Sequence, residues 1–257
     1  MADRVGVITG ASSGIGAALA RELGQKGDKL VLSARREELV RKVAEESGEE
    51  AVAVVCDVTK REDVYRLRDE ALARFGHVDF WVNNAGRATG KKVLDLDDKE
   101  MQDVIDVVIK SVVYGMQAIV PHFVERGKGH LINVSSAMGR VPFVTFRSIY
   151  SASKSAVNIL TSNLRVDLAD YPGIKVSLVL PGIVDTDFHR VANTPEPMKA
   201  GTAVGPLVVL SAEEVARRMA DLIDHPVPEL YIPEELGEMA KAYYSDVGAF
   251  EERMRRR

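Results

Sequence analysis

The sequence has only one cysteine, Cys56, in 257 residues. A single cysteine cannot form an internal disulfide, so the composition does not indicate a secreted, disulfide-stabilised protein. The first residues lack the apolar core of a signal peptide, and no apolar run reaches the roughly 18 residues of a membrane span. We therefore expect a cytoplasmic protein without a membrane partner.

The chain also lacks a strong excess of charge of either sign. Its formal net charge is −4, so no general surface for binding nucleic acid is implied. Residues 251–257 are expected to form a small basic tail. A few arginines at the end of an acidic chain are more often solvated than bound to nucleic acid, so we expect no such partner.

Short apolar runs alternate with segments that carry apolar residues at helical spacing. The expected strands are residues 5–9, 30–33, 51–56, 78–82, 131–134, 176–180 and 229–232, and the expected helices are residues 14–25, 37–46, 61–75, 101–125, 152–169 and 213–223. This alternation predicts an α/β fold with a doubly wound parallel sheet of Rossmann type, about seven strands and helices on both faces. The length favours a single dinucleotide-binding and catalytic domain, residues 1–257.

A glycine-rich turn directly follows the first expected strand. Gly10 permits the tight turn, Gly14 lets the backbone approach a pyrophosphate, and Gly16 lets the next helix pack closely. The free N–H groups and positive dipole at the start of that helix favour phosphate. The turn therefore predicts a dinucleotide site, although a turn that only joins strand to helix is the alternative. Its other predicted contact residues are Ser12, Ser13 and Ile15.

No acidic residue occurs between Lys29 and Arg36, around the end of the second expected strand. In dinucleotide folds an acidic side chain there binds the ribose 2′-hydroxyl of NAD, whereas an arginine accommodates the 2′-phosphate of NADP. Arg35 therefore favours NADP(H), with NAD(H) still possible. The alternative is that Arg35 and Arg36 are solvated charges at the start of a helix.

Further motifs follow the later strands in order along the chain. They are Asp57-Val58, Asn83-Asn84-Ala85-Gly86, Ser135-Ser136, Tyr150-Ser151-Ala152-Ser153-Lys154, and Pro181-Gly182 with Thr186. Together with residues 9–16, this set resembles the short-chain dehydrogenase/reductase family in its single-domain branch. The resemblance extends from about residue 4 to residue 190.

The resemblance implies a role in cofactor binding for several of these residues. Asp57 is similar to the residue that binds the adenine amino group, with Val58 beside the ring, and Thr186 to the residue that contacts the nicotinamide carboxamide. The remaining implied cofactor-binding residues are Asn83, Ala85, Gly86, Tyr150, Lys154, Pro181 and Gly182.

The resemblance also implies a catalytic set, in which Tyr150 is the acid/base, Lys154 assists it and Ser136 holds the substrate oxygen. Hydride transfer to a carbonyl creates an alkoxide that needs a proton, but the ordinary tyrosine pKa near 10 is high for this work. Tyr150 and Lys154 lie on one helix face, so we expect the lysine cation to lower the tyrosine pKa. Ser136 can donate a hydrogen bond to the developing oxyanion.

The sequence departs from the family pattern at two positions. Val108 stands where most members have an asparagine that holds a water of the proton relay, and we expect Val108→Asn to preserve or raise turnover. Ser136 lies one position further from Tyr150 than is usual, so Ser135 could be the working serine, although its motif position favours Ser136.

These features predict an NADP-dependent oxidoreductase acting on a small alcohol or carbonyl. The alternative is a dinucleotide-binding regulatory protein of the same fold with weak or lost catalysis. Substrate contacts are expected from residues 87–93, from residues 138–147 and from a lid, residues 183–210. Arg140, Arg147 and His189 could bind an anionic group there. No metal-ligand set is predicted, and the resemblance implies a homo-oligomer formed through the helices at 101–125 and 152–169.

Overall fold

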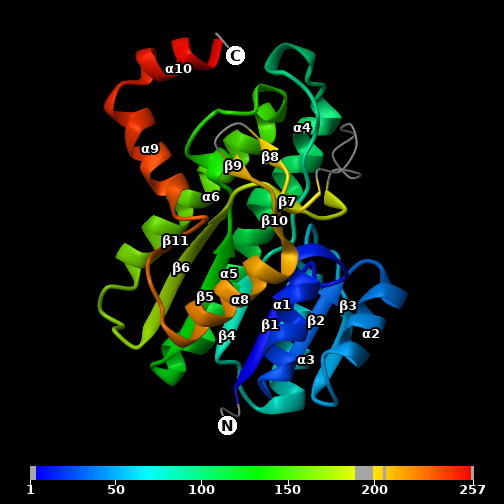
Figure 1. Ribbon diagram of the computed structural model, residues 1–257. Helices are drawn as coiled ribbons and strands as arrows, with labels where there is room; N and C mark the ends of the chain where they lie inside the picture. Colours follow the sequence, from blue (N-terminus) through cyan, green and yellow to red (C-terminus); the bar gives the residue numbers. More distant parts are fainter. Residues whose placement is uncertain (1–3, 189–198, 205–206, 256–257) are drawn as a thin grey trace.

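The computed structural model describes residues 4–188, 199–204 and 207–255 (Figure 1). Its centre is a seven-stranded parallel sheet with the strand order β11-β6-β5-β4-β1-β2-β3. The strands are β1 (Val5–Thr9), β2 (Lys29–Ala34), β3 (Ala51–Val55), β4 (Phe80–Asn83), β5 (Gly129–Val134), β6 (Ile174–Pro181) and β11 (Glu229–Ile232). The strand order reverses beside β1, which is the point where ligands bind in open sheets of this kind.

Helices cover both faces of this sheet. They are α1 (Gly14–Gln25), α2 (Glu37–Glu46), α3 (Arg61–Phe75), α4 (Asp98–Ile105), α5 (Ser111–Arg126), α6 (Ser148–Asp167), α8 (Ala212–Asp224), α9 (Glu235–Ser245) and α10 (Val247–Arg255). Side chains of α1, α2 and α8 form one apolar core with the sheet, and those of α3, α5 and α6 form the other. The predicted Rossmann-type fold with seven strands is confirmed.

The structure differs from the expected elements in three places. The helix expected over residues 101–125 consists of α4 and α5, separated by a π-helical turn, Asp106–Lys110. The region expected to form a lid contains the short strands β7 (Val184–Asp185), β8 (Ala203–Val204), β9 (Leu207–Val208) and β10 (Leu210–Ser211), while residues 189–198 and 205–206 lie outside the described part. Residues 251–255 of the expected tail belong to α10, because apolar residues such as Phe250 pack that segment against α9.

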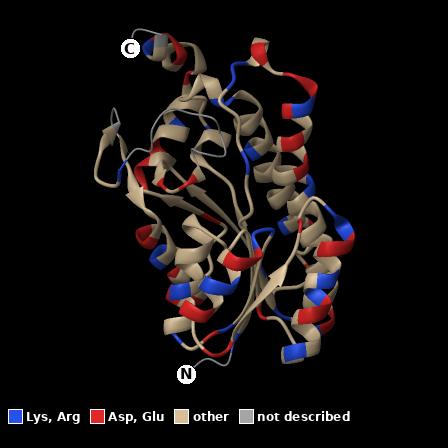
Figure 2. Ribbon diagram, turned by 90° about the vertical axis from the view of Figure 1, so that its right-hand side faces the viewer, with Lys and Arg blue, Asp and Glu red and all other residues tan. Residues whose placement is uncertain are grey.

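The segment Asp98–Arg126 is long and apolar enough to cross a membrane, with an 18-residue window of mean hydropathy 1.5. Such a window also occurs in core helices. Here α5 buries Met116, Ile119 and Phe123 in the apolar core on the sheet, so a structural role accounts for the composition. Figure 2 shows charged residues mainly along the outer helices and few in the central sheet.

Candidate active site

A cavity of about 360 Å³ opens at the carboxyl ends of the strands, where the resemblance places the cofactor and the substrate. This volume lies within the usual range for small-molecule sites. Residues from the ends of β1 to β6, from the π-helical turn and from α6 contribute to its walls. The lining residues include Gly10, Ser12, Ser13, Gly14, Ile15, Arg35, Asp57, Val58, Ala85, Gly86, Ser136, Tyr150, Lys154, Pro181, Gly182 and Thr186.

The turn between β1 and α1 has a backbone that requires glycine. Gly10 and Gly14 have φ values of 68° and 58°, in the left-handed region that other residues rarely adopt. A Cβ atom on Gly10 would lie 2.8 Å from the Ala85 Cα, and one on Gly14 would lie 3.1 Å from the Thr186 methyl group. The helix N-cap, Ser13, makes no side-chain cap hydrogen bond, so the first N–H groups of α1 are available to phosphate. These features fit a bound pyrophosphate.

Arginine and serine side chains gather beside this turn. The Arg36 guanidinium donates hydrogen bonds to Ser12 Oγ at 2.9 Å and to Ser13 Oγ at 2.7 Å. Arg35 also lines the cavity. From the sequence Arg36 was expected only as a solvated charge. Its position next to Arg35 was the one feature that could have indicated a place in the cofactor site. The cluster brings cationic and hydroxyl donors to the end of β2, where a ribose is expected.

The adenine side of the cavity is ordered by hydrogen bonds around Asp57. Its Oδ1 accepts hydrogen bonds from the Thr59 backbone N–H at 3.1 Å and from Thr59 Oγ1 at 2.8 Å. The Asp57 backbone N–H in turn donates to Asp63 Oδ2 at 2.9 Å. This carboxylate is therefore held at the cavity wall beside Val58.

Two of the predicted cofactor-binding residues do not line the cavity. Gly16 lies under the turn, where an added Cβ would be 2.7 Å from the Gly10 carbonyl oxygen. Asn83 is buried and accepts a hydrogen bond from Trp81 Nε1 at 2.8 Å, while its Nδ2 donates to Asn133 Oδ1 at 2.8 Å. Both residues therefore support the site from behind its wall, Gly16 by close packing and Asn83 by hydrogen bonds within the sheet.

Ser136, Tyr150 and Lys154 lie together on the floor of the cavity. The Lys154 Nζ lies 5.7 Å from the centre of the Tyr150 ring and donates to the Val134 carbonyl oxygen at 2.7 Å. All three side chains are buried, and α6 presents the tyrosine and the lysine on consecutive turns. The structure thus brings the expected catalytic set into one place.

Burial dominates the protonation of this set. It raises the pKa of Tyr150 to about 12, and the Ser136 hydroxyl and the Arg147 charge act in the opposite direction. Burial lowers the pKa of Lys154 to about 8. The sequence predicts that Lys154 is the cation that lowers the pKa of Tyr150. In the structure the Arg147 charge acts in that direction, and Lys154 Nζ donates to the Val134 carbonyl oxygen, so an effect of Lys154 on Tyr150 stays a prediction.

The two adjacent serines point to different partners. Ser135 Oγ lies 2.5 Å from Asn158 Oδ1, on the side facing α6. Ser136 Oγ accepts a hydrogen bond from the Met138 N–H at 3.2 Å, and its hydroxyl influences the pKa of Tyr150. Of the two, Ser136 is the serine coupled to the tyrosine.

The π-helical turn lies against the catalytic helix and contains Val108. The Val108 side chain is fully buried in the apolar core under α5 and α6, whereas its neighbour Val107 lines the cavity. Ser111 Oγ donates to the Val107 carbonyl oxygen at 2.6 Å. Turns of this kind interrupt the regular hydrogen-bond pattern of a helix and often occur at functional sites.

Apolar side chains form the wall above Tyr150. The ring centre of Phe188 lies 5.6 Å from that of Tyr150, and Met138 and Ala88 complete the cluster. Arg140 is turned away from the cluster, since it pairs with Glu229. Arg147 remains close enough to affect Tyr150, and it donates to the Thr89 carbonyl oxygen at 3.5 Å. The remaining predicted contact, His189, lies outside the described residues.

Comparisons with known proteins agree with this geometry. The family model for short chain dehydrogenases matches residues 4–197. An uncharacterised oxidoreductase of Staphylococcus epidermidis is 34% identical over 224 residues, which cover 87% of this chain and 92% of the relative. A short-chain dehydrogenase/reductase from Burkholderia phymatum, solved in complex with NAD, superposes with a TM-score of 0.85 at 26% identity, covering 96% of each chain. An alcohol dehydrogenase from Thermococcus sibiricus, complexed with 5-hydroxy-NADP, gives a TM-score of 0.76 at 30% identity, covering 89% of this chain and 95% of that one.

The chain therefore belongs to the short-chain dehydrogenase/reductase family, as the resemblance indicated. It is an oxidoreductase of that family whose cofactor is a nicotinamide dinucleotide, NAD(H) or NADP(H).

Proposed function

We propose that the protein transfers a hydride between NADP(H) and a small, largely apolar alcohol or carbonyl compound. The observation that carries the proposal is the placement of Ser136, Tyr150 and Lys154 on the floor of the cavity that also contains the glycine turn. The nicotinamide would supply or accept the hydride when bound. The other steps belong to side chains of this chain.

Tyr150 is suited to donate the proton that the substrate oxygen needs after carbonyl reduction. Its raised pKa keeps the phenol protonated at neutral pH, which is the form required of an acid. The Ser136 hydroxyl can hydrogen-bond the same oxygen and stabilise its developing charge. Lys154, with a pKa near 8, can carry a proton at neutral pH and bind the ribose hydroxyls of the cofactor.

The test is turnover of a carbonyl and alcohol panel by the wild type and by Tyr150→Phe. Loss of the proton donor should reduce kcat by about 100-fold or more, because general acid catalysis contributes that much. Tyr171→Phe is the matched control, since Tyr171 is an exposed tyrosine beyond the end of α6. Equal turnover by Tyr150→Phe and the wild type would contradict the proposed mechanism.

The preference for NADP(H) rests on Arg35 and on the Arg36–Ser12–Ser13 cluster. Titration with NADPH and NADH, followed by fluorescence, measures the preference directly. Replacing Arg35 by alanine should weaken NADPH binding about tenfold or more, the usual effect of losing a hydrogen bond to a charged group, and leave NADH binding unchanged. Arg41→Ala on α2 is the control, because Arg41 pairs with Glu37 outside the cavity. Equal or tighter binding of NADH by the wild type would contradict the preference.

A regulatory dinucleotide-binding protein is the second candidate. Val108 favours it, because a buried valine cannot hold the relay water through its side chain. Tight NADPH binding without any Tyr150-dependent turnover would support this second function and exclude the first.

We also propose a homo-oligomer formed through α5 and α6. The exposed face of α6 carries no charge over four turns, and Ile159 and Val166 are 59% and 74% exposed. Val166→Glu should reduce the assembly size in sedimentation experiments, whereas Leu39→Glu on α2 should not. A monomeric wild type would contradict the oligomer. A cytoplasmic location stays a prediction.

A further inference from the structure

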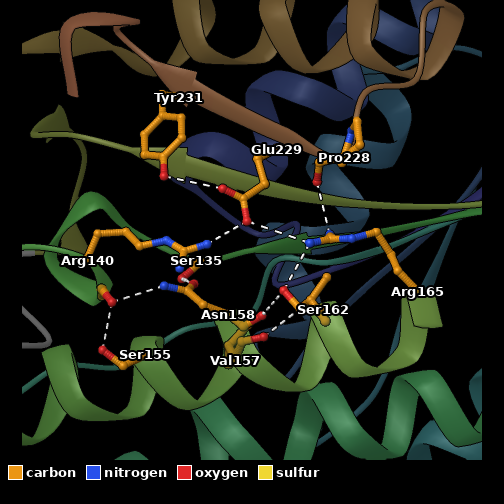
Figure 3. Close-up of polar contacts among 12 residues, drawn as sticks. Ser135, Arg140, Ser155, Val157, Asn158, Ser162, Arg165, Pro228, Glu229 and Tyr231 are labelled. Atoms are coloured by element: carbon orange, nitrogen blue, oxygen red, sulfur yellow. Dashed lines mark hydrogen bonds and ion pairs between the residues drawn. The ribbon is translucent and has the colours of Figure 1, made fainter. Parts of the chain in front are cut away.

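One buried side chain links the loop after β5 that contains Ser136, here called the Ser136 loop, to the helix α6. Asn158 lies one turn after Lys154 on α6 and is 1% exposed. Its Oδ1 accepts a hydrogen bond from Ser135 Oγ at 2.5 Å, and its Nδ2 donates to the Gly139 carbonyl oxygen at 3.0 Å. Figure 3 shows both contacts, which come from the two ends of the loop. A single amide therefore binds the residue before Ser136 and the residue that ends the following 3-10 helix, Ala137–Gly139.

The loop also packs directly on the backbone of α6. A Cβ atom on Gly139 would lie 2.8 Å from the carbonyl carbon of Lys154 and 3.0 Å from its Cβ, so only glycine allows this approach. Ser155 Oγ adds a second hydrogen bond to the Gly139 carbonyl oxygen, at 2.7 Å. The loop is thus attached to the helix that carries both Tyr150 and Lys154.

A second attachment lies on the outer side of the loop. Arg140, the next residue, pairs with Glu229 of β11 at 2.5 Å, and Tyr231 donates to the other Glu229 oxygen at 3.3 Å. Arg165 of α6 lies 3.6 Å from the same carboxylate (Figure 3). This group connects the loop to the edge strand, but it touches neither serine.

The pair of hydrogen bonds that Asn158 makes with Ser135 and Gly139 requires an amide. Asparagine supplies an acceptor for Ser135 and a donor for Gly139 at one position. Leucine has a similar volume and offers neither, and aspartate in its ionised form offers only acceptors. Because the site is buried, water cannot replace the missing partner without a rearrangement of the loop.

We propose that Asn158 is a positioning residue for the reaction proposed above, which holds the Ser136 hydroxyl at the distance from Tyr150 that the reaction requires. It touches neither substrate nor cofactor in this role. It acts through the loop, since Ser136 lies between the two points that the amide binds.

The test compares Asn158→Leu with the wild type and with Ser162→Ala. Ser162 is the control because it lies one turn further along α6, bonds the Asn158 carbonyl and Arg165, and does not contact the loop. With NADPH and the best substrate of the panel, Asn158→Leu should lower kcat about tenfold or more, because small misplacements of reacting groups are costly. The NADPH dissociation constant should change less than twofold. The substrate KM should change less than kcat, because the misplaced hydroxyl mainly weakens binding of the transition state.

A double variant separates positioning from stability. Asn158→Leu leaves the Ser135 hydroxyl with only its 3.2 Å hydrogen bond to the Lys154 carbonyl oxygen. Adding Ser135→Ala removes this hydroxyl and should recover part of the lost thermal stability. If the role is positioning, kcat stays lowered in this double variant although its thermal stability recovers. Recovery of kcat to the wild-type value would show that Asn158 only stabilises the fold, and would overturn the proposal.

Crystal structures of the wild type and Asn158→Leu give a readout that needs no turnover. We expect the Ser136 hydroxyl to move relative to Tyr150, and an unchanged separation would overturn the positioning role. Failure of the proposed function looks different, because it appears as wild-type turnover that does not depend on Tyr150.

Discussion

The central sheet has an amino-terminal edge, where its parallel strands begin, and a carboxyl-terminal edge, where they end. These two edges hold buried polar groups in opposite ways. At the amino-terminal edge polar side chains on different strands bond to one another, whereas at the carboxyl-terminal edge several of them face a cavity. Arg4 pairs with Asp28 at 2.8 Å at the amino-terminal edge, and His130 shares a 2.8 Å hydrogen bond with Ser177. At the other edge, the serine, tyrosine and lysine of the catalytic set line the cavity.

This contrast separates stability from function. Paired buried groups stabilise the fold when complete and cost free energy when one partner is removed. Groups that face a cavity are held in place by the rest of the molecule and are available to a ligand. We therefore expect substitutions at the amino-terminal edge to change the free energy of unfolding and leave cofactor binding intact. Substitutions at the carboxyl-terminal edge should change ligand binding or turnover.

The largest expected effect is at Asp28, whose side chain is 1% exposed. Asp28→Asn removes the buried carboxylate of this pair and leaves Arg4 only its more exposed partner, Asp224, so the free energy of unfolding should fall by about 3 kcal/mol. Urea unfolding measures the loss, and titration with NADPH should give an unchanged dissociation constant. A large loss of NADPH affinity in the folded variant would break the proposed separation of the two edges.

The next effect is a pH dependence at the same edge. Burial lowers the pKa of His130 from 6.5 to about 4. As the pH falls below 6.5, His130 becomes protonated in the unfolded chain but stays neutral in the folded chain until about pH 4. The free energy of unfolding therefore falls by about 3 kcal/mol over this range. The variant His130→Gln has no imidazole at this position, so its free energy of unfolding should not include this decrease.

Urea unfolding of the wild type and His130→Gln at pH 7 and pH 4 isolates that contribution. The free energy of unfolding of the wild type minus that of the variant should be about 3 kcal/mol smaller at pH 4 than at pH 7. Parallel losses of stability in both proteins would show that His130 does not carry the pH dependence.

A pair of glycines sharpens the comparison, because both have positive φ and they lie at opposite edges. Gly10 has a φ of 68° and is enclosed, whereas Gly27 has a φ of 86° and a Cβ atom added to it would have no neighbouring atom within 4 Å. Alanine at either position stores about 1–3 kcal/mol of backbone strain. Only Gly10→Ala should also displace the phosphate turn and weaken NADPH binding, by about tenfold or more.

Melting temperatures and NADPH titrations of the two glycine variants provide the measurement. Equal loss of affinity in both would mean that strain anywhere in the fold reaches the cofactor site. Unchanged affinity in Gly10→Ala would mean that the turn does not bind the pyrophosphate.

The smallest expected effect is at Val108, a position that concerns both the stability of the fold and the proton relay. Val108→Asn places an amide in a fully buried apolar cluster and should lower the free energy of unfolding by about 1 kcal/mol. We still expect turnover to be preserved or raised if the amide can hold water near Lys154. Loss of activity in a variant that remains folded would show that the family relay does not apply to this chain.

Much of the cofactor half of the site could be predicted from the sequence, because its residues follow their strands directly. The turn after β1 and the motifs after β3, β4 and β6 need only the parallel order of the strands to come together. The close packing at Gly16 was also predicted from this turn. The hydrogen bond from Asn83 to Asn133 could not be seen along the chain, because Asn133 lies on the neighbouring strand β5.

The substrate half was less predictable, because its contacts join residues far apart in the sequence. Arg140 and Arg147 look equivalent in the sequence, yet one pairs with Glu229 and the other lies near Tyr150. The interruption of the long helix at Asp106–Lys110 also leaves no signal in its apolar periodicity.

The sequence by itself determined the family, the sheet and the candidate catalytic residues, because these depend on local periodicity and on motifs at strand ends. Only the tertiary structure decided which groups influence one another. The Arg147 charge opposes the effect of burial on the pKa of Tyr150, and Asn158 ties the Ser136 loop to α6. The physical reason is that hydrogen bonds and charge effects depend on distances of a few ångströms across segments that the chain order does not bring together.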